Sequence, residues 1–486
     1  MAEYETVIGL ECHVELSTRT KMFCGCRNEF GAEPDTNVCP VCLGHPGALP
    51  VPNEAAIESI VKIGLALECG IAPHSLFHRK NYFYPDMPKN FQISQYDLPI
   101  CVGGRLAIEV DGATREIGIT RVHMEEDTGK TTHAGVTGRI GQADYALVDY
   151  NRAGVPLVEV VSEPDMRSPE DARAYLTELR STLRALDVSD VRMEEGSLRC
   201  DANISTRREG DTPFGMRVEI KNLNSIRSLE RALRFEEDRQ RAALEAGETI
   251  TQETRHFDET TGRTSTLRSK EEAFDYRYFP EPDLPPLEPS AEWVEGIRAS
   301  LPELPAARRA RYVGELGLTR EQAVALVAND RLAELFDHAF EASKGAAGHT
   351  VANWITQNLV GVANERRLDL DTLEVDAEQI ASIIRLVEDG SMSSTAGKQV
   401  LDEVVATGKA AEQIVDEKGL RQVSDTSQLE VWADETIAEN PGPVEQFRNG
   451  KEGAINALVG QVMKKSRGSA NPQVVQQILR QRLSGS

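Results

Sequence analysis

The sequence is poor in aromatic and basic residues. Aromatic side chains make up 5% of its 486 residues, and 54 lysines and arginines stand against 78 aspartates and glutamates, which gives a formal net charge of −24. Because an acidic surface repels phosphate, this composition argues against broad, nonspecific binding of nucleic acid. The C-terminal end differs, since seven basic residues and one acid occur from Arg448 onward. An acidic body with a basic end fits the docking of one shaped RNA.

Long apolar runs are also missing. No run of 18 apolar residues occurs, and Met1–Glu5 does not open the basic and apolar segments of a signal peptide. All eight cysteines lie at or before Cys200, and four of them stand singly in apolar or strand-like surroundings. We therefore expect no membrane partner, no disulfide framework and a reducing, cytoplasmic location.

Familiar catalytic signatures are absent as well. There is no G-x-S-x-G nucleophile elbow, so glutamine hydrolysis is not expected on this chain. Gly129–Thr131 resembles the end of a P-loop, but Met124 replaces the required upstream glycine, and no glycine-rich dinucleotide loop follows a strand. A bound nucleotide would therefore depend on metal, backbone and lysines. Lys80 and Lys221 are candidates, although lysines on a surface strand are more often simply solvated.

Four cysteines form the most specific motif. Cys24 and Cys26 are separated from Cys39 and Cys42 by twelve residues, so two close thiol pairs can wrap one ion. Structural Zn²⁺ is commonly bound by four thiolates in a tetrahedron, and these four cysteines can supply them. The first pair is spaced C-x-C, whereas C-x-x-C is the commoner spacing. The alternative is a set of reduced surface thiols, and the spacing favours zinc.

The spacing of apolar residues changes along the chain and divides it into a strand-rich part and a helical part. Up to about residue 290 alternating segments predict strands, with helices at 54–69, 169–186 and 227–247. A proline-rich stretch at 280–289 ends the strand signals, and helical patterns follow it. An Asp111-Gly112 dipeptide between two alternating segments predicts a type I′ hairpin. We predict an α+β protein with three domains: residues 1–290, 291–400 and 401–486.

Several predicted strands have one apolar and one polar face. Glu11 and His13 stand two apart on the polar face of residues 8–16, so both can reach one ion. Residues 123–127 add a carboxylate cluster. Glu159 is a single carboxylate inside an apolar strand, where burying an unpaired charge would be costly. Carboxylates with one imidazole favour Mg²⁺ or Mn²⁺ over zinc, and Mg²⁺ commonly arrives with nucleotide phosphates.

These segments resemble the B subunit family of bacterial aspartyl/glutamyl-tRNA amidotransferases. The resemblance spans essentially the whole chain, and its last part is similar to the tail domain related to the YqeY family. The stretches that carry it are Glu5–Leu16, Arg79–Asp86, Gln92–Tyr96, His123–Asp127, Ser162–Asp165, Met193–Ile204, Lys221–Asn224, Asp275–Pro280, Leu458–Met463 and Ala470–Pro472.

The resemblance implies a division of labour. A separate amidase (glutaminase), the A subunit, releases ammonia from glutamine, and a small third protein, the C subunit, braces the pair. Misacylated tRNA, Glu-tRNA(Gln) or Asp-tRNA(Asn), is bound by the B subunit, which uses ATP to phosphorylate the side-chain carboxyl of the attached amino acid. Ammonia then displaces the phosphate. The residues leave two alternatives: a non-catalytic zinc-knuckle RNA-binding module, and a stand-alone amidotransferase with its own glutaminase.

The resemblance also assigns roles to residues. It implies a cradle-like catalytic domain with Mg²⁺ held by Glu11, His13, Glu126 and Glu159, and zinc held by the four cysteines. We regard four further residues as candidate contacts to nucleotide or substrate: Lys80, Asp201, Asn203 and Lys221. The helical tail is expected to meet the tRNA elbow, with Lys464, Lys465 and Arg467 neutralising its phosphates.

Overall fold

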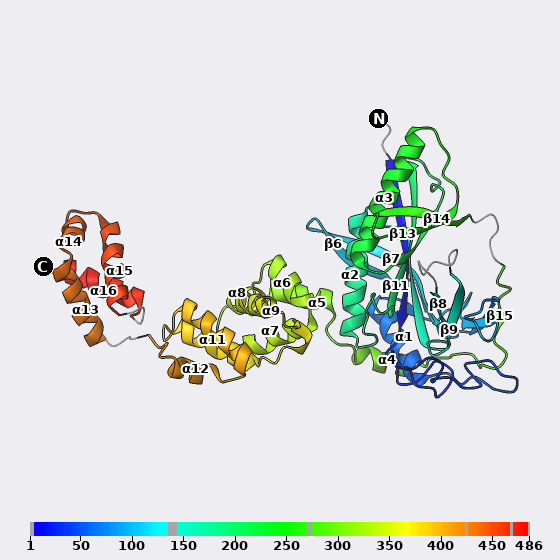
Figure 1. The fold of residues 1–486 in the computed structure, drawn as a ribbon, viewed down its shortest axis with the longest axis horizontal. Coiled ribbons are helices and arrows are strands. Elements are labelled where there is room, and N and C mark those ends of the chain that lie inside the picture. Colours follow the sequence, from blue (N-terminus) through cyan, green and yellow to red (C-terminus); the bar gives the residue numbers. More distant parts are fainter. Residues whose placement is uncertain (1–3, 135–142, 270–274, 423–425, 467–469, 485–486) are drawn as a thin grey trace. The chain divides into compact units, whose positions relative to one another are not determined.

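The computed structural model describes residues 4–134, 143–269, 275–422, 426–466 and 470–484 (Figure 1). The chain forms two compact units, residues 1–306 and 307–486, which we describe separately. Among the described residues no strand follows Pro280, and the rest of the chain is helical. The predicted α+β class is therefore confirmed. In the described segments, no helix is long and apolar enough to cross a membrane.

The first unit is built around a ten-stranded sheet. Its neighbouring strands are antiparallel except for one parallel pair, formed by residues 218–221 and 253–256. In spatial order the strands are β14 (Arg263–Ser269), β13 (Glu253–Asp258), β12 (Val218–Leu223), β11 (Leu198–Arg208), β1 (Tyr4–Glu15), β10 (Pro156–Ser162), β7 (Ala113–Glu126), β5 (Cys101–Val102) and β2 (Gly70–Ile71), while β6 (Arg105–Val110) pairs with β7.

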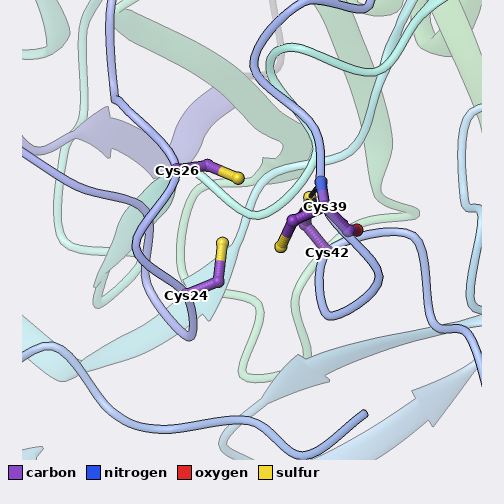
Figure 2. A group of neighbouring side chains, drawn as sticks. All are labelled: Cys24, Cys26, Cys39 and Cys42. Carbon is purple, nitrogen blue, oxygen red and sulfur yellow. Dashed lines mark hydrogen bonds between the residues drawn. The ribbon is translucent and has the colours of Figure 1, made fainter.

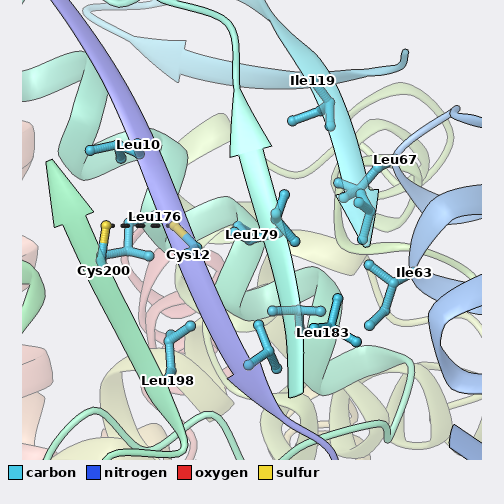
Figure 3. Close-up of a cluster of buried hydrophobic side chains, with 14 of the residues drawn as sticks. Leu10, Cys12, Ile63, Leu67, Ile119, Leu176, Leu179, Leu183, Leu198 and Cys200 are labelled. Atoms are coloured by element: carbon cyan, nitrogen blue, oxygen red, sulfur yellow. Dashed lines mark hydrogen bonds between the residues drawn. The ribbon is translucent and has the colours of Figure 1, made fainter. Parts of the chain in front are cut away.

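Helices cover the apolar face of this sheet (Figure 3). They are α1 (Glu54–Ala66), α2 (Pro169–Ala185) and α3 (Ile226–Glu245), which confirms the three predicted helices within a few residues. The hydroxyl of Ser168 accepts a hydrogen bond from the backbone N–H of Asp171 and so caps the N-terminus of α2. Buried side chains from helices and strands form one core, among them Leu10, Cys12, Ile63, Leu67, Ile119, Leu176, Leu179, Leu183, Leu198 and Cys200.

The hairpin between β6 and β7 has the predicted turn. Asp111 and Gly112 have φ angles of 52° and 78°, and Val110 pairs with Ala113. Two successive left-handed residues define a type I′ turn, whose twist matches that of the strands it joins. The long strand β7 therefore starts in a fixed register and carries its polar residues to the centre of the sheet.

Smaller sheets complete the first unit. One consists of β15 (Phe279–Pro280), β3 (His78–Asn81) and β4 (Phe91–Ser94), and the other of β8 (Lys130–Ala134) and β9 (Tyr145–Asp149). Arg79 joins β3 to the segment after β15 through two hydrogen bonds to Glu281, of 2.7 and 2.8 Å. Helix α4 (Ala291–Ala299) adds Ile297 to the core. The unit therefore extends past the proline-rich stretch, beyond the boundary expected at 290.

The second unit is helical and has two separate cores. The first core runs from Tyr312 to Val415 and the second from Leu429 to Leu483. The division expected near residue 400 falls inside a helix whose Val400 and Val404 belong to the first core, so the cores divide between 415 and 429. The elements are α5 (Pro305–Gly314), α6 (Arg320–Val327), α7 (Asp330–Ala342), α8 (Gly348–Asn353), η2 (Trp354–Leu359), α9 (Val360–Arg366), η3 (Leu370–Thr372), α10 (Ala377–Glu388), α11 (Ser394–Thr407), α12 (Ala411–Glu417), α13 (Thr426–Glu439), α14 (Pro441–Arg448), η4 (Glu452–Ala454), α15 (Ile455–Lys465) and α16 (Pro472–Ser484).

Candidate functional site

Polar side chains gather on the face of the large sheet that points away from the helices. Alternation along β1 turns Cys12 into the core and leaves Glu11 and His13 on the other face. The antiparallel register then places His13 opposite Glu159 of β10, and Glu159 opposite His123 of β7. Three neighbouring strands therefore present their ionisable groups side by side.

Three of these side chains lie within ligand distance of one another: His13, Glu125 and Glu159. Nε2 of His13 is 3.9 Å from Oε1 of Glu125 and 3.7 Å from Oε2 of Glu159. Nε2 of His123 is 3.2 Å from the same oxygen of Glu159. Both carboxylates are buried. Two buried carboxylates beside an imidazole are a donor set that fits a hard divalent cation such as Mg²⁺.

Glu126 does not join this cluster. It belongs to the opposite side of β7, where its side chain is buried, forms an ion pair with Lys89 and accepts a 2.9 Å hydrogen bond from the N–H of Ile93. The geometry therefore groups Glu125, and not the expected Glu126, with His13 and Glu159. The physical reason is the two-residue period of a strand, because adjacent residues point to opposite faces.

Glu11 extends the polar face toward β11 and β12. Its Oε1 accepts a 3.0 Å hydrogen bond from Nδ2 of Asn203. Burial, and then the charge of Glu159, raise the pKa of Glu11. Next to it, Nζ of Lys221 lies 2.8 Å from Oδ2 of Asp201. The structure therefore places the predicted Asp201, Asn203 and Lys221 on the same face, paired with one another or with Glu11.

Lys80 approaches the cluster from the small sheet. Its ammonium lies 5.2 Å from the ring centroid of Tyr276. Burial alone would lower the pKa of Lys80. The negative charges of Glu125 and Glu159 contribute most to outweighing this effect, so the pKa of Lys80 lies above its ordinary value. Burial raises the pKa of Glu159, but His123, His13 and Lys80 together bring it well below the usual range. The site therefore holds an ionised carboxylate surrounded by cationic or cation-capable groups.

A second carboxylate pair lies further along β1. Burial, followed by the charge of Asp127, raises the pKa of Glu15 to about 8, while Asp127 is ion-paired with Arg199. Burial alone would raise the pKa of Asp127. The charges of Arg199 and Arg152 outweigh this effect, so the pKa of Asp127 is lowered. A protonated Glu15 therefore lies beside an ionised Asp127 at neutral pH.

The four cysteines converge as the spacing predicts (Figure 2). Their sulfur atoms all lie within 4.8 Å of one another, and those of Cys39 and Cys42 are 3.9 Å apart. A tetrahedral ion with Zn–S bonds of about 2.3 Å needs sulfurs about 3.8 Å apart. The donor set and its spacing fit a structural zinc.

A buried lysine accompanies the cysteines. Nζ of Lys21, a fully buried side chain, lies 3.8 Å from Sγ of Cys42. A hydrogen bond from Cys24 contributes most to lowering the pKa of Cys42 to about 5, against the effect of burial, and the N–H of Cys39 and Lys21 add to it. A thiolate is the form that binds metal, so Cys42 is the best prepared of the four to act as a ligand, whereas the hydrogen bond to Cys42 and burial raise the pKa of Cys24.

The basic end of the chain is only partly available. Lys465, in the last turn of α15, forms ion pairs of 2.9 and 2.8 Å with Glu435 and Glu439 of α13. Lys464 is exposed. Arg467 lies outside the described residues. Of the predicted phosphate contacts, the structure therefore leaves Lys464 exposed and shows Lys465 engaged within its own bundle.

Sequence reasoning found the cluster at residues 123–127 but did not select His123 or Glu125 from it. The signal was present, because Val122 and Met124 alternate with them and belong to the apolar face. Val122, Met124 and Glu126 follow one another at the two-residue period of a strand, so all three point to the apolar face. Glu125 therefore points to the polar face.

Comparison with known proteins agrees with this geometry. Residues 6–295 match the family described as the GatB/GatE catalytic domain, and residues 334–483 match the family described as the GatB domain. Three similar relatives are each named as the B subunit of an aspartyl/glutamyl-tRNA(Asn/Gln) amidotransferase. That of Carboxydothermus hydrogenoformans is 51% identical over 100% of both chains. That of Moorella thermoacetica is 53% identical over 99% of this chain and 100% of its own.

The third relative, from Frankia casuarinae, is 54% identical over 100% of this chain and 97% of its own. Identity of about one half along the full length is far more than a shared fold requires. The family predicted from the ordered sequence motifs is confirmed. The chain belongs to the GatB family, that of the B subunits of aspartyl/glutamyl-tRNA(Asn/Gln) amidotransferases.

Proposed function

We propose that this chain is the activating subunit of a tRNA-dependent amidotransferase, a ligase that forms carbon–nitrogen bonds. The observation that supports it most directly is the buried group of His13, Glu125 and Glu159 in a chain that matches amidotransferase B subunits from end to end. Its substrates are Glu-tRNA(Gln), Asp-tRNA(Asn) or both, and ATP.

His13, Glu125 and Glu159, with Glu11 beside them, are the residues that would hold Mg²⁺. When bound, the ion supplies charge that offsets the phosphates of ATP. Lys80, whose charge faces the same carboxylates, is placed to neutralise an incoming carboxylate or phosphate. The Asp201–Lys221 pair and Asn203 extend the polar face on which the nucleotide would lie.

The proposed reaction has two steps. The side-chain carboxylate of the attached amino acid attacks the γ-phosphorus of ATP, which forms an acyl phosphate and releases ADP. Ammonia then attacks the acyl carbon, a C–N bond replaces the C–O bond to phosphate, and the released phosphate takes up one proton from the ammonia. A carboxylate is a poor acyl donor to ammonia, and the first step converts it into one with a good leaving group.

The sequence offers no nucleophile elbow for hydrolysing glutamine, which favours an external source of ammonia. We therefore propose that the chain works with a separate amidase, the A subunit, and with the small C subunit. The exposed Lys464 is proposed to contact the tRNA backbone, and the four cysteines to hold a structural Zn²⁺. Unbridged cysteines and a tRNA substrate suit the cytoplasm.

The test is reconstitution with both partner proteins. Purified complex should convert Glu-tRNA(Gln) to Gln-tRNA(Gln) with ATP and free ammonia, and release one ADP for each amide formed. A complex that binds the tRNA yet makes no amide under these conditions would refute the enzyme and support a non-catalytic RNA-binding module. Glutaminase activity in the isolated chain would refute the division of labour.

A further inference from the structure

Half of the chain's ten tyrosines gather at one place on its surface. They are Tyr82, Tyr84, Tyr96, Tyr276 and Tyr278, in a protein whose aromatic content is only 5%. All five belong to the small sheet or to segments that flank β3, β4 and β15. We call the three that form its centre, Tyr96, Tyr276 and Tyr278, the tyrosine platform.

The rings of the tyrosine platform are ordered against one another. Tyr96 and Tyr278 stack with their centroids 4.3 Å apart and an interplanar angle of 10°. Tyr276 meets Tyr278 edge to face at 6.1 Å. Beside them, Tyr82 and Tyr84 form a second stacked pair at 6.2 Å. Stacking fixes the ring planes before any ligand arrives, which lowers the entropy cost of binding.

The platform is open to solvent at Tyr96, which is 57% exposed, while its other two tyrosines are half-buried. Beside the platform, Tyr84 is 48% exposed and Phe83 81%. A contiguous patch of exposed aromatic rings commonly marks a binding site. Arg277 stands between Tyr276 and Tyr278 in sequence, and its 83% exposed side chain lies 3.9 Å from Oδ2 of Asp275, so the same segment carries an exposed cation.

The platform also adjoins the carboxylate cluster. The ammonium of Lys80, whose charge faces Glu125 and Glu159, lies over the ring of Tyr276. On the other side, the hydroxyl of Ser94 is 3.5 Å from Oε2 of Glu125, and Tyr96 follows Ser94 by two residues. A ligand stacked on the platform therefore has its next few atoms within reach of the cluster.

We propose that the tyrosine platform binds the unpaired 3′-terminal nucleotides of aminoacyl-tRNA by stacking their bases, with Arg277 near their phosphates. This inference rests on the proposed function for the identity of the RNA. Single-stranded ends are recognised by bases stacked on aromatic rings, and such sites are open grooves. The adenine of a free nucleotide is more commonly enclosed, since small-ligand sites bury most of their ligand. The exposure of Tyr96 therefore favours the RNA end.

The experiment uses the assembled complex and a tRNA whose terminal adenine is replaced by fluorescent 2-aminopurine. Stacking should quench the fluorescence on binding to the unaltered complex, and Tyr96→Ala and Tyr278→Ala should remove most of the quenching. Because stacking contributes about 1–3 kcal/mol per base, the KM for aminoacyl-tRNA should rise roughly 5- to 150-fold. The KM for ATP should stay unchanged.

Two matched variants separate stacking from folding. Tyr96→Phe keeps the ring and should retain the quenching. Phe214→Ala removes another ring of similar exposure, 58%, on a different part of the same unit and should behave as the unaltered complex. Thermal unfolding of each variant shows whether the small sheet remains folded.

A rise in the KM for ATP with unchanged quenching would overturn the proposal and place the adenine of ATP on the platform. Quenching that survives both alanine variants would overturn it as well. Failure of the proposed function is distinguishable, because the complex would then form no amide whatever the fluorescence shows. Quenching that depends on Tyr96 in such an inactive complex would support the platform as an RNA site.

Discussion

His13 and Glu159 lie directly opposite each other on neighbouring antiparallel strands, and Nε2 of the first is 3.7 Å from Oε2 of the second. The pair is fixed by backbone register, which the alternation of β1 and the buried apolar residues of β10 specify. The site is therefore built on interior strands of the large sheet. Changes in these side chains should alter chemistry with little effect on the fold.

Glu125 and Glu126 should give opposite results when each is changed to Gln. Glu125→Gln removes a carboxylate from the cluster and should lower ammonia-dependent amidation roughly 100-fold or more, with stability retained. Glu126→Gln leaves the buried Lys89 ammonium unpaired and should cost about 3–5 kcal/mol of unfolding free energy. Denaturant unfolding and initial rates measure the two effects. A stable but inactive Glu126→Gln protein would restore Glu126 as a metal ligand.

Loss of one zinc-site cysteine should unfold part of the first unit. Cys39→Ser breaks the four-sulfur set, and because a structural zinc site contributes folding free energy, the protein should bind no zinc and melt at a lower temperature. Atomic absorption and calorimetry test this. The control is Cys69→Ser, since Cys69 is buried but distant in sequence from the four ligands. If a chelator abolished amidation without lowering the melting temperature, zinc would be catalytic.

Glu15 predicts a pH dependence of stability. Its folded pKa of about 8 lies above its ordinary 4.5, so the folded state retains a proton that the unfolded state releases. Stability from this group is therefore fully present below pH 4.5 and diminishes as the pH rises toward 8. Glu15→Gln keeps a neutral donor beside Asp127, and it should raise the unfolding free energy at pH 7 by about 1–3 kcal/mol. Denaturant titrations at pH 5 and pH 8 should show a smaller difference for the variant than for the original protein.

The boundary between the two helical cores determines where the chain can be truncated without unfolding the first of them. Truncation after Gln422 keeps α12, whose Ile414 and Val415 are buried in the first helical core, and should leave that core cooperative. This truncation should raise the KM for aminoacyl-tRNA while leaving the KM for ATP and the melting temperature of the core unchanged. Truncation after Gly408 also removes α12 and should lower that melting temperature. Equal tRNA affinity of the truncated and full chains at matched salt would make the tail a scaffold.

Lys464 and Lys465 should differ in tRNA binding although they are neighbours. Removing one lysine that neutralises a phosphate reduces the slope of log affinity against log salt by about 0.7–0.9. Lys464→Ala should show this reduction. Lys465→Ala should show less, because Glu435 and Glu439 already compensate its charge. Filter binding over a salt series measures both slopes, and a larger effect at Lys465 would mean that the tRNA displaces the two carboxylates.

The sequence by itself determined the α+β class, the three helices on the sheet, the hairpin turn at Asp111 and the four-cysteine set. Each depends on a local pattern: alternation, capping, turn chemistry or ligand spacing. It also determined that Glu11 and His13 share one polar strand face. The family followed from motifs distributed along the whole chain.

Only the tertiary structure decided which groups meet. Cross-strand register and the approach of β3 and β4 bring His123, Glu125 and Lys80 to Glu159, and these contacts join residues far apart in sequence. The partner of Glu126 is Lys89, and α13 supplies the carboxylates that pair with Lys465. A sequence pattern specifies the face on which a side chain lies. The charge it meets there depends on packing between elements, which no local pattern encodes.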